Sequence, residues 1–283
     1  MTKTTSKLMR VGHSPDPDDA FMFYALAKEK IPMQGFRVEH VIEDIESLNQ
    51  RALRSELEVT AVSCHAYAYL ADRYLVMQSG SSVGDQYGPV LVGKTTPDSS
   101  RLNLKGKKIA VPGKLTTAYL VLQLFEPEIE PVFTPFDEIF DEVLAGRVDY
   151  SLVIHEGQIT YEEKGLRKLI DLGEWWHEKT KLPLPLGLDV IRRDLGTETV
   201  QSFAKLFKTS IEFALNHRKE ALDYALQFGR GIRENLGDQF VGMYVNHYTV
   251  DLGEKGKAGL ERLLQEGYEK GILPQKITPV FVP

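Results

Sequence analysis

His155 is the side chain of this sequence that is best placed for proton transfer. It ends the apolar run Tyr150–Ile154, which predicts a buried strand, and Glu156 and Gly157 follow it. An imidazole changes its charge near neutral pH, so it accepts a proton where a carboxylate is a weak base. The position predicts a general base at the carboxyl end of a strand, although a structural histidine hydrogen-bonded at a strand end gives the same pattern.

Three further strand ends run directly into polar residues that open a helix. A helix start leaves backbone N–H groups without partners and attracts carboxylate or phosphate groups through them. If the three face one cleft, they predict a small anionic organic ligand, whereas ordinary helix capping is the alternative for each one alone. The candidate ligand-binding residues at these ends are Ser14, Ser63, Cys64, His65, Thr116, Thr117 and Ala118.

Two motifs match functional patterns without the elements that those patterns need. Gly88–Thr95 fits the phosphate-binding pattern G-x-x-x-x-G-K-[ST], but its interior is an apolar strand and Pro97 interrupts the helix that must follow. Gly80–Gly84 fits the hydrolase pattern G-x-S-x-G, again with no helix after it. Neither a nucleotide site nor a serine hydrolase is predicted.

A short acidic group, Asp16, Asp18 and Asp19, precedes an apolar helical pattern. Its spacing departs from that of calcium-binding loops, and no metal site is predicted in the chain. Short acidic side chains accept hydrogen bonds from the first-turn amides of a helix, so we interpret the group as a helix cap. Asp16 and Asp18 would then point outward, because carboxylates at the cleft disfavour an anionic ligand.

The elements that position these residues follow from hydrophobic periodicity. Apolar runs rich in valine and isoleucine alternate with amphipathic stretches, which predicts an α/β fold. The expected strands are residues 8–13, 36–43, 59–63, 74–78, 89–93, 108–111, 130–134, 150–154 and 169–172. The expected helices are residues 18–30, 45–54, 65–73, 116–125, 136–145, 198–216, 219–228, 236–248 and 255–270.

Two segments interrupt this alternation, the polar Lys94–Leu104 and the proline-containing Leu182–Gly187. We predict that they cross between two domains, as in a two-domain periplasmic-binding-protein-like (type II) fold with its ligand in the interdomain cleft. Residues 1–94 and 188–283 would form a large α/β domain with a helical C-terminal wrap. Residues 95–187 would form a small α/β domain.

Composition narrows the class of protein. The 283 residues are 42% hydrophobic and 26% charged, as in globular proteins. With 34 basic and 40 acidic residues the net charge is −6, which argues against nucleic-acid binding. The single cysteine, Cys64, excludes an internal disulfide, and we find no signal sequence or membrane-spanning run. We expect a soluble cytoplasmic protein without nucleic-acid or membrane partners.

Several blocks occur in a distinctive order: His155–Tyr161 (HEGQITY), Leu169–Trp176 (LIDLGEWW) and Leu182–Gly187 (LPLPLG). They resemble the 1,4-dihydroxy-6-naphthoate synthases of the futalosine route to menaquinone. Ser14–Phe21 (SPDPDDAF) and Pro112–Ala118 (PGKLTTA) are similar to the opening block and the second-domain loop of that family. The resemblance spans nearly the whole chain, and the HEGQITY block is its most specific part.

The resemblance implies a carbon–carbon lyase that converts cyclic dehypoxanthine futalosine to 1,4-dihydroxy-6-naphthoate, with loss of a ribosyl fragment and with no metal or organic cofactor. The family's active-site histidine falls on His155, and its ligand contacts fall near Ser63 and on Thr116, Thr117 and Ala118. Two alternatives stay open: a non-catalytic binding protein for a small carboxylate, and a chorismate dehydratase of the same pathway. The dehydratases share the short blocks but not the one that begins at His155.

At its opening block the sequence departs from the family's commoner Cys-Pro-Asn-Asp-Thr version. It has Asp16, Asp18 and Ala20 there. It also carries Cys64 and His65 directly after Ser63. Ligand contacts at these positions are therefore expected to differ from those of the commoner version.

Overall fold

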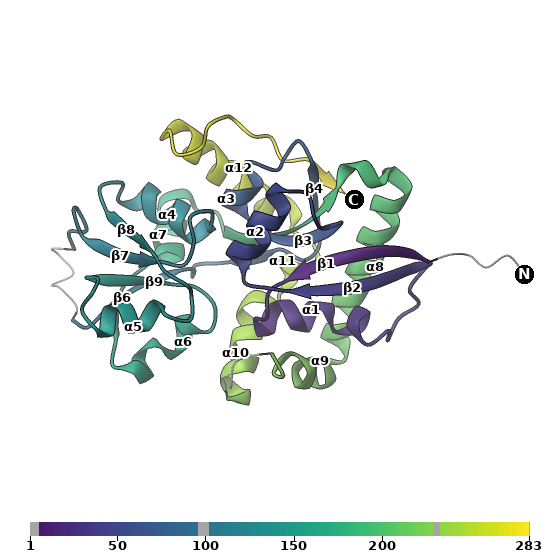
Figure 1. Cartoon of the computed structure of the whole chain (residues 1–283), viewed down its shortest axis with the longest axis horizontal. Coiled ribbons are helices and arrows are strands. Elements are labelled where there is room, and N and C mark those ends of the chain that lie inside the picture. Colours follow the sequence, from purple (N-terminus) through teal and green to yellow (C-terminus); the bar gives the residue numbers. More distant parts are fainter. Residues whose placement is uncertain (1–5, 96–101, 229–232, 283) are drawn as a thin grey trace, which may run out of the picture.

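The structure is a computed structural model that describes residues 6–95, 102–228 and 233–282. Its strands form two sheets, which lie next to each other along the long axis of the molecule (Figure 1). The strands of the first sheet are β1 (Lys7–His13), β2 (Phe36–Ile42), β3 (Val59–Ser63), β4 (Tyr74–Met77), β5 (Ser82–Gly84), β11 (Leu184–Arg192) and β12 (Phe281–Val282). Those of the second are β6 (Val90–Gly93), β7 (Lys108–Val111), β8 (Glu130–Phe133), β9 (Tyr150–Val153) and β10 (Arg167–Asp171).

Both sheets are mixed. The first has the order β12-β4-β11-β3-β1-β2, with β5 paired to β11, and the second has the order β10-β6-β9-β7-β8. The neighbours β1, β2 and β3 are parallel, and β11 runs antiparallel to β3 and β4. Every residue of β3 is buried, which explains its unbroken apolar character apart from Thr60 and Ser63. The carboxyl ends of β1 and β3 therefore reach the same edge of the first sheet.

Helices cover the sheets and connect their strands. They are α1 (Pro17–Ala27), α2 (Ile45–Leu53), α3 (Cys64–Tyr67), α4 (Thr117–Phe125), α5 (Ile139–Leu144), α6 (Gly157–Thr160), α7 (Leu172–Thr180), α8 (Thr197–Asn216), α9 (Arg218–Ala225), α10 (Glu234–Tyr244), α11 (His247–Val250) and α12 (Gly253–Glu269). Two short 3-10 helices, η2 (Tyr161–Lys164) and η3 (Arg193–Leu195), complete the described elements. No helix of the described residues has the length and apolar character that crossing a membrane requires.

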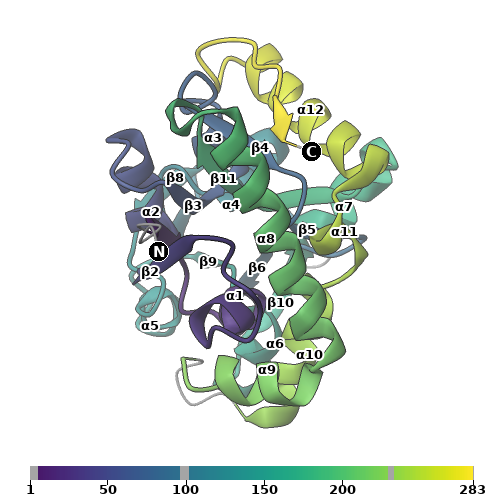
Figure 2. The same ribbon diagram turned by 90° about the vertical axis from the view of Figure 1, so that its right-hand side faces the viewer.

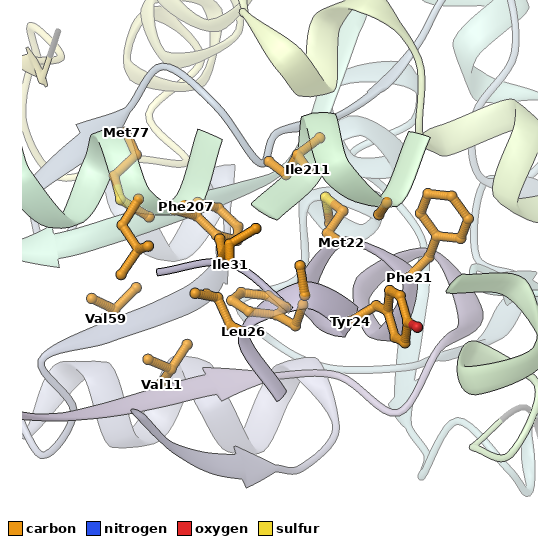
Figure 3. Close-up of a cluster of buried hydrophobic side chains, with 14 of the residues drawn as sticks. Val11, Phe21, Met22, Tyr24, Leu26, Ile31, Val59, Met77, Phe207 and Ile211 are labelled. Carbon is orange, nitrogen blue, oxygen red and sulfur yellow. The ribbon is translucent and has the colours of Figure 1, made fainter. Parts of the chain in front are cut away.

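The long helix α8 and the buried helix α1 fix the larger half of the molecule. Residues 17–26 of α1 are all buried, because α1 is enclosed by α8, α9 and α10 (Figure 2). Phe23 of α1 stacks on Phe207 of α8, with ring centroids 4.7 Å apart. Val11 and Val59 of the sheet and Ile211 of α8 belong to the same apolar cluster (Figure 3). This packing holds the amino end of α1 in place.

The first passage between the sheets lies earlier in the chain than the sequence predicts. Strand β6 pairs with β9 and β10, so the chain has entered the second sheet before Lys94. The predicted crossing at Lys94–Leu104, of which residues 96–101 lie outside the described residues, is instead a connection within the second sheet. Polar composition marks a surface loop, but it does not tell whether the loop joins two domains or two strands of one sheet.

The return passage is also shorter than expected. Strand β11 begins at Leu184 and pairs with β5 and β3, so Leu184–Gly187 already belongs to the first sheet. The chain later ends in β12, which pairs with β4. We propose that the domains divide between β5 and β6 and between α7 and β11, in place of the divisions expected after residues 94 and 187.

Most expected strands and helices are present, with two differences near the candidate site. The helix expected over residues 65–73 is the single-turn α3, which ends at Tyr67. The expected final helical stretches are present as α8, α9, α10, α11 and α12. The segment after His155 forms two short helices, α6 and η2, which hydrophobic periodicity does not indicate in so few residues.

Candidate functional site

A cleft with about 720 Å³ of open space lies between the two sheets. Its walls come from the start of α1, the end of β3, β5, the start of α4, the residues after β9, the middle of β11 and the end of α10. The sequence-predicted residues that line it are Ser14, Ser63, Thr116, Thr117, Ala118 and His155. Cys64 and His65 are not among the described residues that line it.

The start of α4 offers backbone groups to the cleft. Thr116 is the N-cap: its Oγ1 accepts from the Tyr119 N–H (3.3 Å) and donates to the Gly113 carbonyl (2.9 Å). The Thr117 Oγ1 accepts from the Cys64 N–H (2.8 Å) and donates to the Leu186 carbonyl (2.5 Å). Both hydroxyl groups therefore already donate and accept hydrogen bonds within the protein. The ligand-binding groups that remain here are the first backbone N–H groups of the helix, which have no intrahelical acceptor.

The end of β3 is organised by Asn49, a fully buried residue of α2. The Asn49 side chain accepts from the Ser63 N–H (2.9 Å) and donates to the Ser63 Oγ (3.1 Å). The Ser63 and Cys64 amides, expected to be free for a ligand, are thus occupied within the protein. A hydroxyl both accepts and donates, so the Ser63 Oγ keeps its proton for an acceptor in the cleft.

Cys64 and His65 contact residues that line the cleft, Thr117 and Thr116. The Cys64 Sγ lies 3.3 Å from the Pro185 carbonyl, and burial raises the pKa of the thiol to about 12, so the thiolate is disfavoured. The His65 Nδ1 lies 3.3 Å from the Thr116 carbonyl, and burial lowers the pKa of the imidazole to about 4. His65 is therefore a neutral ring that braces the start of α4.

His155 lies two residues after the end of β9, in a backbone conformation that residues other than glycine rarely adopt. Its φ is +58° and its side chain is 8% exposed. The Nδ1 atom accepts from the Gly157 N–H (3.1 Å) and lies 3.4 Å from the Glu156 Oε2. The Nε2 atom is buried without a hydrogen-bond partner among the described residues. Such backbone strain and an unpaired buried nitrogen at a cleft wall are typical of functional sites.

The acidic residues of the opening block lie inside the cleft, contrary to the expectation that they point outward. Asp16 occupies the N-cap position of α1, but its side chain forms no capping hydrogen bond. Asp18 and Asp19 are 7% and 8% exposed, and both line the cleft. The Asp19 Oδ2 accepts from the Ser14 N–H (2.8 Å), which fixes Ser14 beside it.

Asp189 of β11 joins this acidic wall and was not predicted from the sequence. It is 1% exposed, and its Oδ1 has no hydrogen-bond partner among the described residues. Burial, and then the nearby charges of Asp19 and Asp18, raise the pKa of Asp189 well above its ordinary value. Burial likewise raises the pKa of Asp18 and of Asp19. The wall favours protonated carboxyl groups.

Asp189→Asn is expected to raise the free energy of unfolding at pH 8 by about 1–3 kcal/mol and to change it little at pH 4. The folded protein holds a proton that the unfolded chain releases near pH 4, so the Asp189 contribution falls as pH rises. Urea unfolding at both pH values measures the difference. The exposed Asp223→Asn on α9 is the control, and an Asp189→Asn effect of equal size at both pH values would contradict this account.

Besides the contact between Cys64 and Thr117, two further hydrogen bonds at the cleft join its two sides. The Tyr244 hydroxyl of α10 donates to the Gln158 Oε1 of α6 (2.6 Å), and both side chains line the cleft. The Leu115 N–H, just before α4, donates to the Glu46 Oε2 of α2 (3.0 Å). None of these four residues carries a sequence signal for its role, because each contact depends on how the two sheets are placed.

Among residues 6–95, 102–228 and 233–282, no three His, Cys, Asp or Glu side chains are grouped to hold a metal ion. The arrangement instead offers backbone N–H groups, a buried imidazole and a carboxyl wall around one cleft. It can hold an organic molecule that carries a carboxylate, and it can place a proton-transfer group against the carbon skeleton of that molecule.

Solved structures of other proteins have the same fold as this chain. The alkanesulfonate-binding protein SsuA from Xanthomonas axonopodis, solved with MOPS bound, has a TM-score of 0.69 at 14% identity and covers 95% of each chain. This likeness confirms the predicted periplasmic-binding-protein-like fold. A crystal structure of an Archaeoglobus fulgidus protein is closer, with a TM-score of 0.89 and 47% identity over 96% of this chain and 100% of that chain.

Sequence comparison adds the family. Two relatives are named 1,4-dihydroxy-6-naphthoate synthase. The one from Thermus thermophilus is 38% identical over 97% of this chain and 99% of its own length. The one from Streptomyces coelicolor is 34% identical over 94% and 95%. A family model described as menaquinone biosynthesis matches residues 9–269. The chain that builds this cleft therefore belongs to the menaquinone-biosynthesis family of enzymes.

Proposed function

We propose that this protein is a carbon–carbon lyase that converts cyclic dehypoxanthine futalosine to 1,4-dihydroxy-6-naphthoate in the cytoplasm. The relatives' names support the product, and the unpaired buried Nε2 of His155 in the cleft supports the chemistry. That nitrogen is the single observation on which the catalytic assignment rests.

In the proposed mechanism, the start of α4 holds the substrate carboxylate. The backbone N–H groups of Thr117 and Ala118 and the Ser63 hydroxyl point to this role, because the other hydroxyls at this wall bind within the protein. The acidic wall disfavours the carboxylate, so the two walls together give the substrate one orientation. No metal or organic cofactor takes part in the proposed reaction.

His155 then removes a proton from the polycyclic carbon skeleton, and loss of the ribosyl fragment leads to the aromatic product. A general base needs its lone pair on Nε2, which places the ring proton on Nδ1. The Glu156 carboxylate, 3.4 Å from Nδ1, favours that tautomer, whereas the Gly157 N–H favours the opposite one. Glu156 is thus the positioning residue of this proposal. Exclusion of water by the closed cleft would protect reactive intermediates.

The test is mass spectrometry of the purified protein after separate incubation with cyclic dehypoxanthine futalosine and with chorismate. Formation of 1,4-dihydroxy-6-naphthoate from the first compound is the expected result. Dehydration of chorismate would instead identify a chorismate dehydratase of the same pathway. No turnover of either compound, together with saturable binding of a small carboxylate, would favour a non-catalytic binding protein.

A further inference from the structure

The cleft has one wall whose chemistry the proposed reaction does not use. Asp18 and Asp189 reach it from α1 and β11, two elements of the larger half, and both line the cleft. The Asp18 Oδ2 accepts a long hydrogen bond from the Ser82 Oγ (3.4 Å). The Asp189 Oδ1 accepts no hydrogen bond from the described residues, although only 1% of the residue is exposed. A buried polar atom without a partner is costly, which points to a ligand group that satisfies it.

The backbone of Gly80 packs closely against the Asp189 carboxyl group, so no larger residue fits there. A Cβ atom at Gly80, whose φ is +99°, would lie 2.3 Å from the Asp189 Oδ2. His155 supplies an independent sign of a ligand, because it lines the same cleft and its buried Nε2 has no hydrogen-bond partner in the described part of the chain. Unpaired buried atoms thus occur on two separate walls of one cleft. A ligand that extends between the walls would satisfy both.

The chemistry of the wall selects among ligand groups. A second carboxylate or a phosphate is disfavoured by the carboxyl groups, and the described residues hold no cluster suited to a metal ion. Hydroxyl groups fit, because a hydroxyl donates to a carboxyl oxygen and accepts from a protonated carboxyl. Burial, which raises the pKa of both Asp18 and Asp189, favours the protonated form.

We propose that Asp18 and Asp189 bind the sugar hydroxyls of the substrate, so that the ribosyl fragment lies against α1 and β11 while the carboxylate lies at α4. The inference rests on the proposed function, since it assigns a place to one part of that substrate. It makes the two aspartates specificity-determining residues. They favour binding of a ligand that carries the sugar over binding of the aromatic product, which has lost the sugar.

Binding of two ligands tests this assignment. Calorimetric titrations use cyclic dehypoxanthine futalosine and 1,4-dihydroxy-6-naphthoate with His155→Asn protein, which is expected to consume the first ligand about 10²–10⁴-fold more slowly than the unsubstituted protein. Adding Asp18→Ala or Asp189→Ala is expected to weaken binding of the sugar-bearing ligand about tenfold, the loss typical of one or two hydrogen bonds to a ligand. Binding of the naphthoate is expected to change less than about twofold. Asp223→Ala, which removes an exposed charge on α9, serves as the matched control for net charge.

Asp18→Asn and Asp189→Asn are expected to keep most of the affinity for the sugar-bearing ligand, because an amide donates and accepts hydrogen bonds as a protonated carboxyl group does. Equal losses for both ligands, unchanged binding of the sugar-bearing ligand, or Asn variants as weak as the Ala variants would overturn the inference. If Asp189→Ala fails to fold, Asp18→Ala and Asp189→Asn still decide it. Failure of the proposed function has a different signature: the sugar-bearing ligand does not bind even when both aspartates are intact.

Discussion

His155→Asn is expected to lower the turnover number by about 10²–10⁴-fold, the range typical of losing a general base. The variant removes the only imidazole among the described residues that line the cleft. Asn suits this position better than Ala does, because His155 has φ +58° and Asn tolerates the left-handed region. Stopped assays with cyclic dehypoxanthine futalosine measure the effect, and circular dichroism checks the fold.

The control for this substitution is His247→Asn, an exposed histidine of α11 that does not line the cleft in the described structure. It is expected to leave turnover unchanged. Binding of the naphthoate product should survive His155→Asn, since the carboxylate is assigned to α4 and not to the imidazole. Turnover by His155→Asn within a few-fold of that of the unsubstituted protein would remove His155 from the chemistry and leave it as a ligand contact.

The placement of His155 could be predicted because it depends on local sequence. An apolar strand pattern that ends in a polar side chain puts that side chain at the strand's carboxyl edge, whichever sheet the strand joins. The cap at Thr116 was predictable for the same reason, since a hydroxyl before an apolar helical pattern accepts a first-turn amide. The sheet to which β6 belongs cannot be predicted from local sequence, because an apolar run of four residues fits either sheet equally well.

The acidic wall shows where sequence reasoning fails. Asp18 follows a proline at a helix start, so capping is the simplest interpretation, and only the tertiary packing of α1 turns it into the cleft. Asp189 interrupts an apolar strand, a signal that a charged residue has an unusual environment. The sequence does not tell which residues face it, because its neighbours Asp18 and Asp19 are about 170 positions away in the chain. Asn49 differs, because its partner Ser63 is only 14 positions away in the chain.

Thr117→Val is expected to lower the free energy of unfolding by about 2–6 kcal/mol, because it leaves two polar groups without partners at about 1–3 kcal/mol each. Those groups are the Cys64 N–H and the Leu186 carbonyl, which the Thr117 hydroxyl now satisfies at 2.8 and 2.5 Å. Thr117 is 2% exposed, so water does not easily replace the lost partner. Urea unfolding measures the change.

Thr117 also joins three elements at the cleft: α3 through Cys64, β11 through Leu186, and α4 to which it belongs. Thr117→Ser keeps the hydroxyl and is expected to lose about 1 kcal/mol or less, for the missing methyl group. Because the hydroxyl is already engaged, folded Thr117→Val protein should bind the naphthoate with an affinity close to that of the Thr117→Ser protein. Weaker naphthoate binding by Thr117→Val without a loss of stability would return the hydroxyl to the ligand-contacting role that the family resemblance assigns to it.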